Sequence, residues 1–223
     1  MCGRFASLLS PDLLVDLYGV PTPQELEFRY NIAPTQKVLV VRQDAAGGRY
    51  LSAVRWGLVP YWAKELSIGS KMINARCESV IERPAFRQAL RTRRCIVPAS
   101  GFYEWAATAK GKVPHYITMR DGSLFSFAGI WESWADPDGH AVETCAILTT
   151  AANGLIETIH DRMPVILHPT EFDLWLDRTL NDPQALQRLY QPYPADLMRL
   201  WVVAPAVNSP SYDSPTCIAP LSA

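Results

Sequence analysis

The chain has 223 residues and a formal net charge of −1, with 48% hydrophobic and 19% charged residues, which is typical of globular domains and excludes wholesale disorder. No apolar run approaches the roughly 20 residues needed to span a bilayer, and the N-terminus lacks a signal-peptide pattern. We therefore expect a cytoplasmic protein of one or two domains, without membrane contact.

Positive charge is concentrated in the first 100 residues, with 14 Lys and Arg against 8 Asp and Glu, whereas residues 101–223 hold 7 against 14. Arginine dominates the basic part, and its planar guanidinium suits phosphate. The asymmetry fits a basic surface that faces nucleic acid, and it fits equally well two halves of one protein that attract each other.

A short helix and a β-hairpin are the first predicted elements. Ser10 and Pro11 provide an N-cap and a first helical position before an apolar run. Residues 37–42 and 50–55 read as two strands of a hairpin with a Gly-rich turn. Residues 82–94 predict a helix with a basic side.

After residue 94, strand-like runs alternate with turn signals. Asp121-Gly122 and residues 136–139 are strong hairpin turns. Two late helices are expected, over 169–177 and 183–190. The predicted strands are 95–97, 101–105, 115–119, 124–131, 144–149, 165–167 and 201–204.

These elements contain no internal repeat and no mid-chain linker. They predict one α+β domain over residues 1–208, with a curved, largely antiparallel sheet or barrel-like core flanked by short helices. The stretch that begins at Pro205 is rich in proline and serine, and residues 209–223 are predicted to be a loosely ordered tail.

Cys2 directly follows the initiator Met1, and removal of Met1 would place a free α-amine and a thiol on one residue. Such a 1,2-aminothiol condenses with an aldehyde to a Schiff base, on which the thiol closes to give a thiazolidine. An unperturbed α-amine titrates near pKa ~7.7–8.0 and a thiol near ~8.5, so both react at neutral pH. The alternative is that a small second residue only permits Met removal.

Three further polar residues interrupt the apolar strand pattern. Glu104 lies between aromatic residues, where a carboxyl tends to have a raised pKa and can act as a general acid. His160 begins a tight polar turn, and Asn74 stands beside an arginine and a carboxylate. From local sequence alone, Glu104 could instead face solvent, His160 could cap a helical turn, and Asn74 could be a turn residue.

The other cysteines and the histidines carry no metal-binding pattern. Five cysteines are widely spaced without a C-x-x-C pair, and the four histidines form no zinc signature, so we expect no metal, no cofactor and no disulfide framework. Trp56 is expected in the core. Trp62, between Pro60 and Lys64, could stack on unpaired bases or pack in the core.

Six motifs occur in one order along the chain, and together they resemble the SRAP family, which holds abasic-site-processing proteins linked to the bacterial SOS response. The resemblance runs from Met1 to about Leu167, and more weakly to about Asn208. The motifs are Cys2-Gly3-Arg4-Phe5, Tyr30-Asn31-Ile32-Ala33-Pro34-Thr35, Trp56-Gly57-Leu58-Val59-Pro60, Ile73-Asn74-Ala75-Arg76, Pro98-Ala99-Ser100-Gly101-Phe102-Tyr103-Glu104-Trp105 and Ile159-His160-Asp161-Arg162-Met163-Pro164.

The resemblance implies that autocatalytic loss of Met1 exposes Cys2, which forms a thiazolidine crosslink with the ring-opened abasic sugar in single-stranded DNA and shields the lesion. It implies that Asn74 hydrogen-bonds the α-amine and the adduct. Glu104 would move protons during Met removal, sugar opening and crosslink formation. His160 would act as a further acid or base.

The resemblance also implies a DNA-binding set. Arg4 and Arg76 would bind phosphates that flank the lesion, with Thr149 a further candidate and Trp62 a candidate to stack against bases. The partner would be single-stranded DNA with abasic sites, bound by a monomer that is cytoplasmic and associated with the nucleoid when it acts.

Three alternatives remain at this point. Met1-Cys2-Gly3 also opens the glutamine amidotransferases that use an N-terminal cysteine, although the first 110 residues contain no Arg-Gly or Asn-Gly dipeptide. The second alternative is a non-catalytic single-stranded DNA-binding protein in which Cys2 has no chemical role. The third is a simple autopeptidase that processes Met1 and does nothing to DNA.

Overall fold

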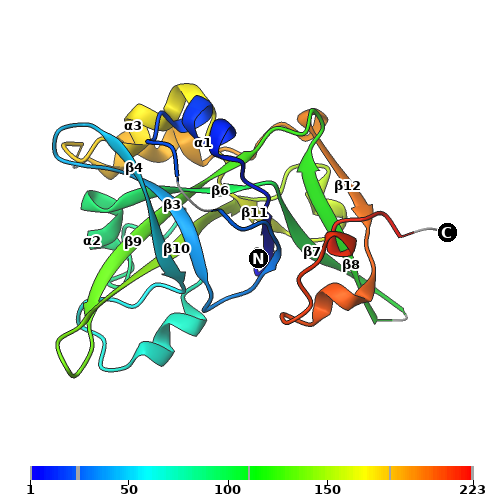
Figure 1. The fold of residues 1–223 in the computed structure, drawn as a ribbon, viewed down its shortest axis with the longest axis horizontal. Coiled ribbons are helices and arrows are strands. Elements are labelled where there is room, and N and C mark those ends of the chain that lie inside the picture. The colour runs from blue at the N-terminus through cyan, green and yellow to red at the C-terminus, as the bar shows by residue number, and fades with distance from the viewer. Residues whose placement is uncertain (1, 24–25, 110, 181, 222–223) are drawn as a thin grey trace.

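The structure is a computed structural model, and it describes residues 2–23, 26–109, 111–180 and 182–221. Short helices surround two β-sheets in one domain, as Figure 1 shows. The predicted α+β class with a largely antiparallel, barrel-like core is therefore confirmed. Among the described residues, no helix is long and apolar enough to cross a membrane.

The larger sheet closes on itself. Within the described residues its strands pair in the cyclic order β10-β4-β3-β6-β9 and back to β10, and all of these pairs are antiparallel except β10–β4. Closure of a sheet removes its free edges and encloses a packed interior. The strands are β3 (Lys37–Gln43), β4 (Arg49–Trp56), β6 (Arg94–Ala99), β9 (Phe125–Ala135) and β10 (Ala141–Ala151).

Two short strands extend this barrel at β10. β5 (Asn74–Arg76) runs parallel to β10, with Asn74 opposite Ile147 and Arg76 opposite Thr149. β11 (Arg162–Pro164) runs antiparallel to β10. The far half of β10 therefore carries two of the motifs that were singled out in the sequence, one on each side.

The second sheet has the order β12-β8-β7-β1-β2, and its described pairs are antiparallel. β1 lies between β7 and β2, so the first strand of the described chain is inside the sheet rather than at its edge. The strands are β1 (Phe5–Ser7), β2 (Arg29–Ile32), β7 (Gly101–Thr108), β8 (Gly111–Met119) and β12 (Met198–Val202).

Among the residues that the structure describes, three α-helices lie outside the sheets, and Figure 1 shows α1 and α3 together at one end of the barrel. They are α1 (Pro11–Tyr18), α2 (Arg87–Thr92) and α3 (Phe172–Leu176). The predicted N-cap is confirmed, because Ser10 accepts the N–H of Leu13 at 3.3 Å.

Several 3-10 helices connect the larger elements in the described chain. They are η1 (Leu66–Lys71), η2 (Ile156–Thr158), η3 (Pro169–Glu171), η4 (Pro183–Tyr190), η5 (Ala195–Leu197), η6 (Pro205–Asn208) and η7 (Pro215–Cys217). The predicted helix over 183–190 is thus present with the tighter 3-10 geometry.

The core joins the two sheets. A buried cluster combines Cys2 and Phe5 from the N-terminal segment with Phe102 from β7 and with Trp56 and Phe127 from the barrel. Phe5 and Trp56 pack edge to face with ring centroids 5.2 Å apart. The prediction that Trp56 belongs to the core is therefore confirmed, and the N-terminal segment is part of that core.

The predicted helix over 82–94 is wrong in length, because only Arg87–Thr92 is α-helical. Pro84 lacks a backbone N–H and restrains the residue before it, so the first part of the segment forms turns. The strand expected at 165–167 is displaced to Arg162–Pro164. The short strands β1, β2 and β5 were not predicted, because three or four residues are too few to show a period of two.

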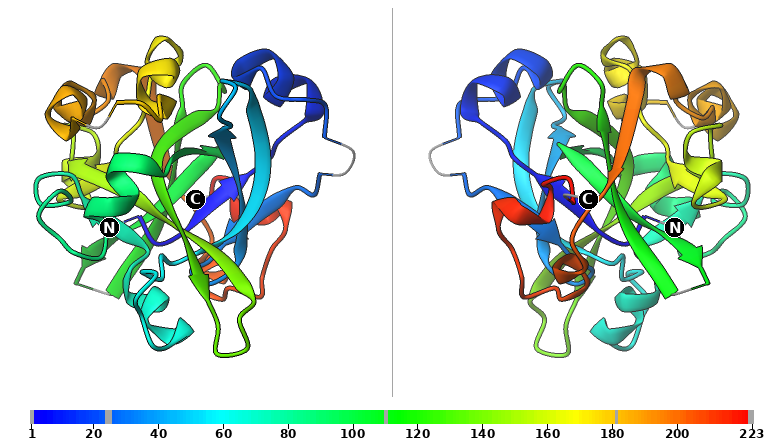
Figure 2. Two further views of the ribbon diagram at one scale, coloured as in Figure 1. Left: turned by 90° about the vertical axis from the view of Figure 1, so that its left-hand side faces the viewer. Right: turned by 90° about the vertical axis from the view of Figure 1, so that its right-hand side faces the viewer.

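The expectation of a loosely ordered tail over 209–223 does not match the structure for residues 209–221, while residues 222 and 223 lie outside the described part. This segment is hydrogen-bonded to β2, and Figure 2 shows it (red) beside the first strands (blue) in both side views. Proline and serine content alone misled the prediction, since the partners of the segment on β2 are more than 170 residues away in sequence.

Candidate functional site

The N-terminal segment is held in place by β7. The backbone N–H of Tyr103 donates to the carbonyl of Arg4 at 2.9 Å, and Phe5 lies opposite Phe102 in the β1–β7 pair. Continuing this antiparallel register brings the residues before Arg4 alongside Glu104. Cys2 and Glu104 are therefore neighbours because two strands pair, although they are 102 residues apart along the chain.

Cys2 is fully buried, and its Sγ lies 4.0 Å from the carbonyl oxygen of Arg4. Burial, and then the negative charge of Glu104, raise the pKa of the Cys2 thiol far above its ordinary value. The thiol is therefore neutral at pH 7 in this environment. Any thiolate chemistry at Cys2 requires a positive charge nearby or a proton acceptor.

Asn74 is directed at Cys2 by the packing of a tryptophan. Trp56 donates its indole N–H to the carbonyl of Ile73 at 2.9 Å, and pairing of β5 with β10 fixes the next residue. Asn74 Nδ2 then donates to the Cys2 carbonyl at 2.8 Å. Its Oδ1 is buried, and it has no hydrogen-bond partner among the described residues. A buried acceptor of this kind is poised for a donor.

Glu104 is 3% exposed, so the local reading that it faces solvent is wrong. Burial raises the pKa of its carboxyl, and the nearby charge of His160 partly opposes that shift. A carboxyl with a raised pKa retains a larger protonated fraction near neutrality and can donate a proton.

His160 follows η2 and stands beside a cavity of about 380 Å³ whose lining includes Ala107 and Ala151. Its Nδ1 accepts the backbone N–H of Arg162 at 3.0 Å and lies 2.9 Å from an oxygen of Asp161. The first contact needs Nδ1 without a proton, whereas the second is an ion pair only when the ring is protonated.

The four residues predicted to act chemically are thus brought together from four separate segments of the chain. A hydrogen bond links Asn74 to Cys2, and electrostatic interactions link Glu104 both to Cys2 and to His160. Met1 lies outside the described residues.

The residues predicted to bind DNA are distributed differently. Arg76 is exposed, and it lies two residues from Asn74 on the same face of β5. Trp62 is 49% exposed and lines a cavity of about 620 Å³ with two lysines. Thr149 is fully buried, and Arg4 is 9% exposed with its Nη1 already bound to Asn31 and Val207.

Two polar pairs near these residues had no predicted role. Arg162 forms a two-pronged ion pair with Glu78, at 2.6 and 2.9 Å, and also donates to the Thr149 carbonyl. Asn31 is fully buried and bridges Arg4 to the C-terminal segment. The only sequence signal for Asn31 is a polar residue inside an apolar-flanked motif.

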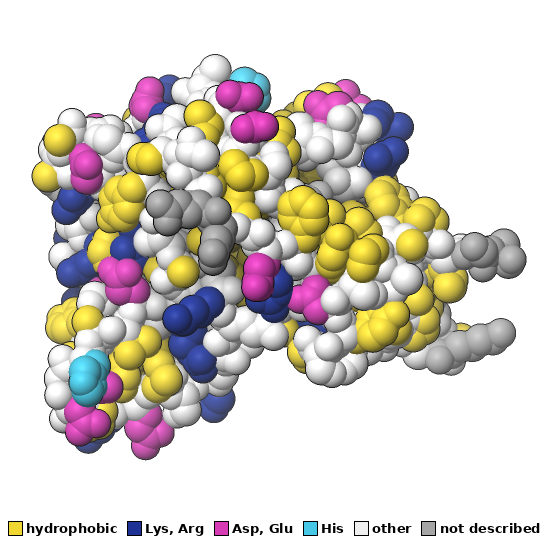
Figure 3. Space-filling model, viewed as in Figure 1, with side chains coloured by type: hydrophobic (Ala, Val, Ile, Leu, Met, Phe, Trp, Pro, Cys, Tyr) yellow, Lys and Arg dark blue, Asp and Glu magenta, His cyan; other side chains and the backbone are white. Residues whose placement is uncertain are grey.

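Side chains of both charges are interspersed on the face drawn in Figure 3, where the described Lys and Arg residues do not gather in one patch. The excess of positive charge in the first 100 residues is therefore not collected on this face. Cys77, Cys95, Cys145 and Cys217 are buried, which is usual for cysteines that pack as small hydrophobic side chains.

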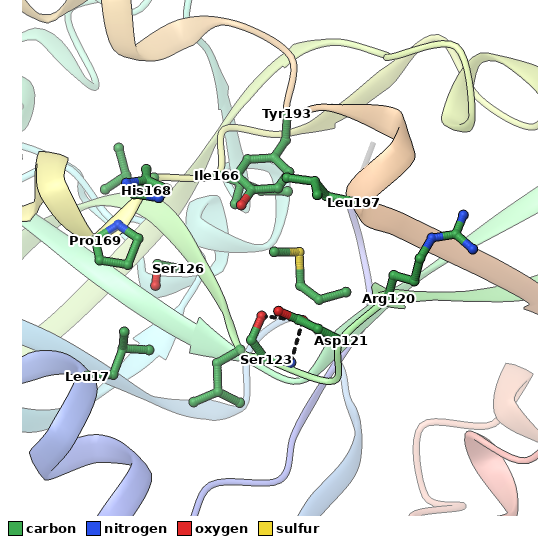
Figure 4. A pocket seen from close by; sticks show the side chains of 13 residues that line it. Leu17, Arg120, Asp121, Ser123, Ser126, Ile166, His168, Pro169, Tyr193 and Leu197 are labelled. Atoms are coloured by element: carbon green, nitrogen blue, oxygen red, sulfur yellow. Dashed lines mark hydrogen bonds between the residues drawn. The ribbon is translucent and has the colours of Figure 1, made fainter.

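A separate cavity of about 520 Å³ lies apart from this site, between α1, the β8–β9 turn and residues 193–197 (Figure 4). Asp121 closes the turn by accepting both the N–H and the hydroxyl of Ser123, at 2.9 and 2.7 Å. The walls combine apolar side chains such as Ile166 and Leu197 with the ring of Tyr193.

Three potential metal ligands meet at the tip of the β9–β10 hairpin, where Asp136, Asp138 and His140 bring ligand atoms within 4.8 Å of one another. Asp136 Oδ1 already accepts the backbone N–H groups of the other two. These bonds are the ordinary closure of an Asp-Pro-Asp-Gly turn, so they explain the cluster without an ion.

Known proteins resemble this chain along nearly its whole length. The model of the family described as SOS response associated peptidase (SRAP) matches residues 1–210. The abasic site processing protein YoqW of Bacillus subtilis is 45% identical over 222 residues, which cover 98% of this chain and 99% of that protein. The abasic site processing protein HMCES of Gallus gallus is 32% identical over 81% of this chain and 61% of its own length.

A solved structure of a protein from Bacteroides thetaiotaomicron has the same fold, with a TM-score of 0.89 and 27% identity over 99% of this chain and all of the other. One from Bordetella bronchiseptica gives a TM-score of 0.80 and 25% identity over 91% of this chain. The match of the family model and of relatives along nearly the whole length shows that this chain belongs to the SRAP family.

Proposed function

We propose that this protein processes abasic sites in DNA, and that it does so by covalent capture through Cys2 after removal of Met1. The proposal is supported chiefly by the assembly of Cys2, Asn74, Glu104 and His160 around the start of the chain. Relatives that are named abasic site processing proteins, at up to 45% identity, supply the substrate class.

The chemistry begins with hydrolysis of the Met1–Cys2 peptide bond, which consumes one water and leaves a free amine on Cys2. The unpartnered Oδ1 of Asn74 is placed to accept a hydrogen bond from this amine. In its cationic form the new amine also lowers the pKa of the adjacent thiol, which burial and Glu104 otherwise raise.

Capture then proceeds in two bond-forming steps. The neutral amine attacks the C1′ aldehyde of the open sugar, and loss of one water gives the imine. The sulfur next bonds to the imine carbon while the thiol proton goes to the nitrogen, so that the net reaction joins aldehyde and aminothiol and releases one water. Glu104 donates the proton that dehydration needs, and His160 exchanges protons with the sugar oxygen.

DNA is held mainly through its phosphates in this proposal. Arg76 is exposed beside Asn74, Arg4 and Thr149 lie nearer the buried end of the site, and Trp62 offers a stacking surface. A single strand suits the site because an unpaired sugar can reach a buried thiol. Binding by the monomer is expected to weaken with salt and to show little sequence preference.

The test is denaturing electrophoresis of the protein with single-stranded DNA that carries one abasic site, beside Cys2→Ala and Cys2→Ser. We expect a band that survives denaturation for wild type alone. Cys2→Ser retains the amine, so it should give a linked band only after borohydride reduction of its imine. Intact mass measures the fraction of each protein that has lost Met1.

The outcome separates the alternatives. A persistent band that forms equally with Cys2→Ala, or no band from wild type that has lost Met1, would refute capture by Cys2. Equal, reversible binding of abasic and intact strands by all variants would instead identify a non-catalytic DNA-binding protein. Duplex DNA with the same lesion, run in parallel, measures the preference for single strands.

A further inference from the structure

The C-terminal segment, residues 205–221, is anchored along its length. It starts with η6, its Val207 and Cys217 are buried against Ala6 and Tyr103, and Leu221 donates its N–H to the carbonyl of Val202 at 2.8 Å. A proline-rich stretch that forms no strand of its own needs such specific contacts to be ordered. These contacts include Tyr103, which directly precedes Glu104.

Asn31 is the centre of these contacts. Its side chain is fully buried, and Nδ2 lies 3.1, 3.0 and 2.7 Å from the carbonyl oxygens of Val207, Ser209 and Tyr212. Its Oδ1 accepts from Nη1 of Arg4 at 2.7 Å. An amide is the side chain that presents donors on one side and an acceptor on the other, so it joins the segment to the arginine.

η6 contacts two residues that flank the site. The Val207 carbonyl accepts from Arg4 Nη1 at 2.8 Å, and Asn208 Oδ1 accepts the indole N–H of Trp105 at 2.7 Å. The Arg4 guanidinium lies 5.9 Å from the centre of the Trp105 ring. Trp105 directly follows Glu104, and the Arg4 carbonyl is the group that lies against the Cys2 thiol.

Asp213 fixes the other end of the segment to β2. Its Oδ1 accepts the backbone N–H groups of Tyr30 and Asn31, at 2.5 and 3.1 Å, and its Oδ2 pairs with Arg29 at 2.6 Å. The segment is thus closed over Asn31 from both sides.

We propose that residues 205–221 form a C-terminal clamp that sets the geometry of the capture site, with Asn31 and Asn208 as its positioning residues. Asn31 holds Arg4, and through the Arg4 backbone it holds Cys2. Asn208 holds Trp105, and through it Glu104. The inference rests on the proposed function, because it concerns the same reaction, but its contacts are independent of that chemistry.

Two variants separate the clamp from general stability. Asn31→Asp keeps the acceptor for Arg4 but replaces the donors to three carbonyls by a second acceptor. Asn208→Ala removes only the exposed acceptor for Trp105, so it should fold. Ser211→Ala is the matched control, because the Ser211 hydroxyl contacts only that of Ser209, at 2.9 Å.

The measurement is the single-turnover rate constant of capture at saturating abasic DNA, normalised to chains that have lost Met1. The dissociation constant is measured with a tetrahydrofuran analogue that cannot react. We expect both clamp variants to lower the rate constant by about tenfold and to change the dissociation constant by less than about threefold, since misplacement of reacting groups affects the chemical step most. Ser211→Ala should match wild type.

Rate constants within twofold of wild type for both clamp variants would overturn the proposal. A rate constant and an affinity that both decrease together with the melting temperature would also overturn the proposal, because that result indicates a merely structural role. If wild type itself captures nothing, the proposed function fails by itself. The clamp is then tested by amide hydrogen exchange over residues 3–7. Asn31→Asp should accelerate this exchange and Ser211→Ala should not. Equal exchange rates in wild type and Asn31→Asp would refute the clamp.

Discussion

Replacement of Glu104 by glutamine tests the acid assigned to the site. Gln has nearly the same shape as the buried, 3% exposed Glu104, but it has no acidic proton to donate. A positioned general acid contributes about 10²–10⁴-fold to a rate. We expect Glu104→Gln to slow capture at pH 7 by about 100-fold, which corresponds to about 2.7 kcal/mol in the activation free energy.

The pH dependence of this effect has a definite sign. Burial raises the pKa of Glu104, so the protonated acid persists to higher pH than it would in water. The ratio of wild-type to Glu104→Gln capture rates cancels the titration of the amine. That ratio should fall as pH increases through the raised pKa. A ratio near one at every pH, or one that increases with pH, refutes the assignment of Glu104 as the acid.

Stability gives a second check on the same carboxyl. Because the folded pKa lies above the unfolded value, the native state binds more protons between the two, and wild-type stability decreases as pH rises through that window. Glutamine does not titrate, so the variant lacks this pH-dependent loss of stability. Glu104→Gln should therefore melt above wild type at pH 8, and the gap should close near pH 4. A wild type that melts higher at pH 8 would show that its carboxylate is stabilised by its partners.

Three other substitutions probe binding and packing. Trp62→Ala should weaken binding of single-stranded DNA by about 1–3 kcal/mol without changing the melting temperature, because the substitution removes one exposed stacking surface. An unchanged affinity would exclude Trp62 from the DNA interface. Gly101→Ala should lower the melting temperature by several degrees, since the Cβ of the alanine would lie 2.3 Å from the ring of Tyr116. An unchanged melting temperature would contradict this packing. Arg162→Lys should lower the free energy of unfolding, measured by denaturant titration, by about 1–2 kcal/mol. Lysine cannot bind both carboxylate oxygens of Glu78, which is itself half exposed. An unchanged free energy of unfolding would show that the ion pair does not stabilise the fold.

The regular elements were predictable because their signals are local. The strands β3 and β4 are seven and eight residues long and flank a turn that contains Gly47 and Gly48, and the cap of α1 is a Ser-Pro pair directly before its apolar run. Such patterns depend on backbone geometry and on burial of one face, and both are properties of neighbouring residues.

The short strands that build the site were not predictable in this way. β1 and β5 contain three residues each, and they are strands only because β7 and β10 supply their hydrogen bonds. Order in the C-terminal segment has the same origin, since Asn31 on β2, which is far away in sequence, binds its Ser209 and Asp213. Pairing of distant backbone groups produces no periodic pattern in the sequence of either segment.

The sequence by itself determined the candidate reactive groups, namely a cysteine behind Met1 and the asparagine, glutamate and histidine of the ordered motifs. The tertiary structure alone decided their state. Strand pairing helps to bury both side chains and brings Glu104 near Cys2. Burial raises the pKa of each group because charge is poorly solvated there, and the charge of Glu104 raises the pKa of the Cys2 thiol further. Solvation depends on every chain segment that excludes water, so it belongs to the fold and not to any motif.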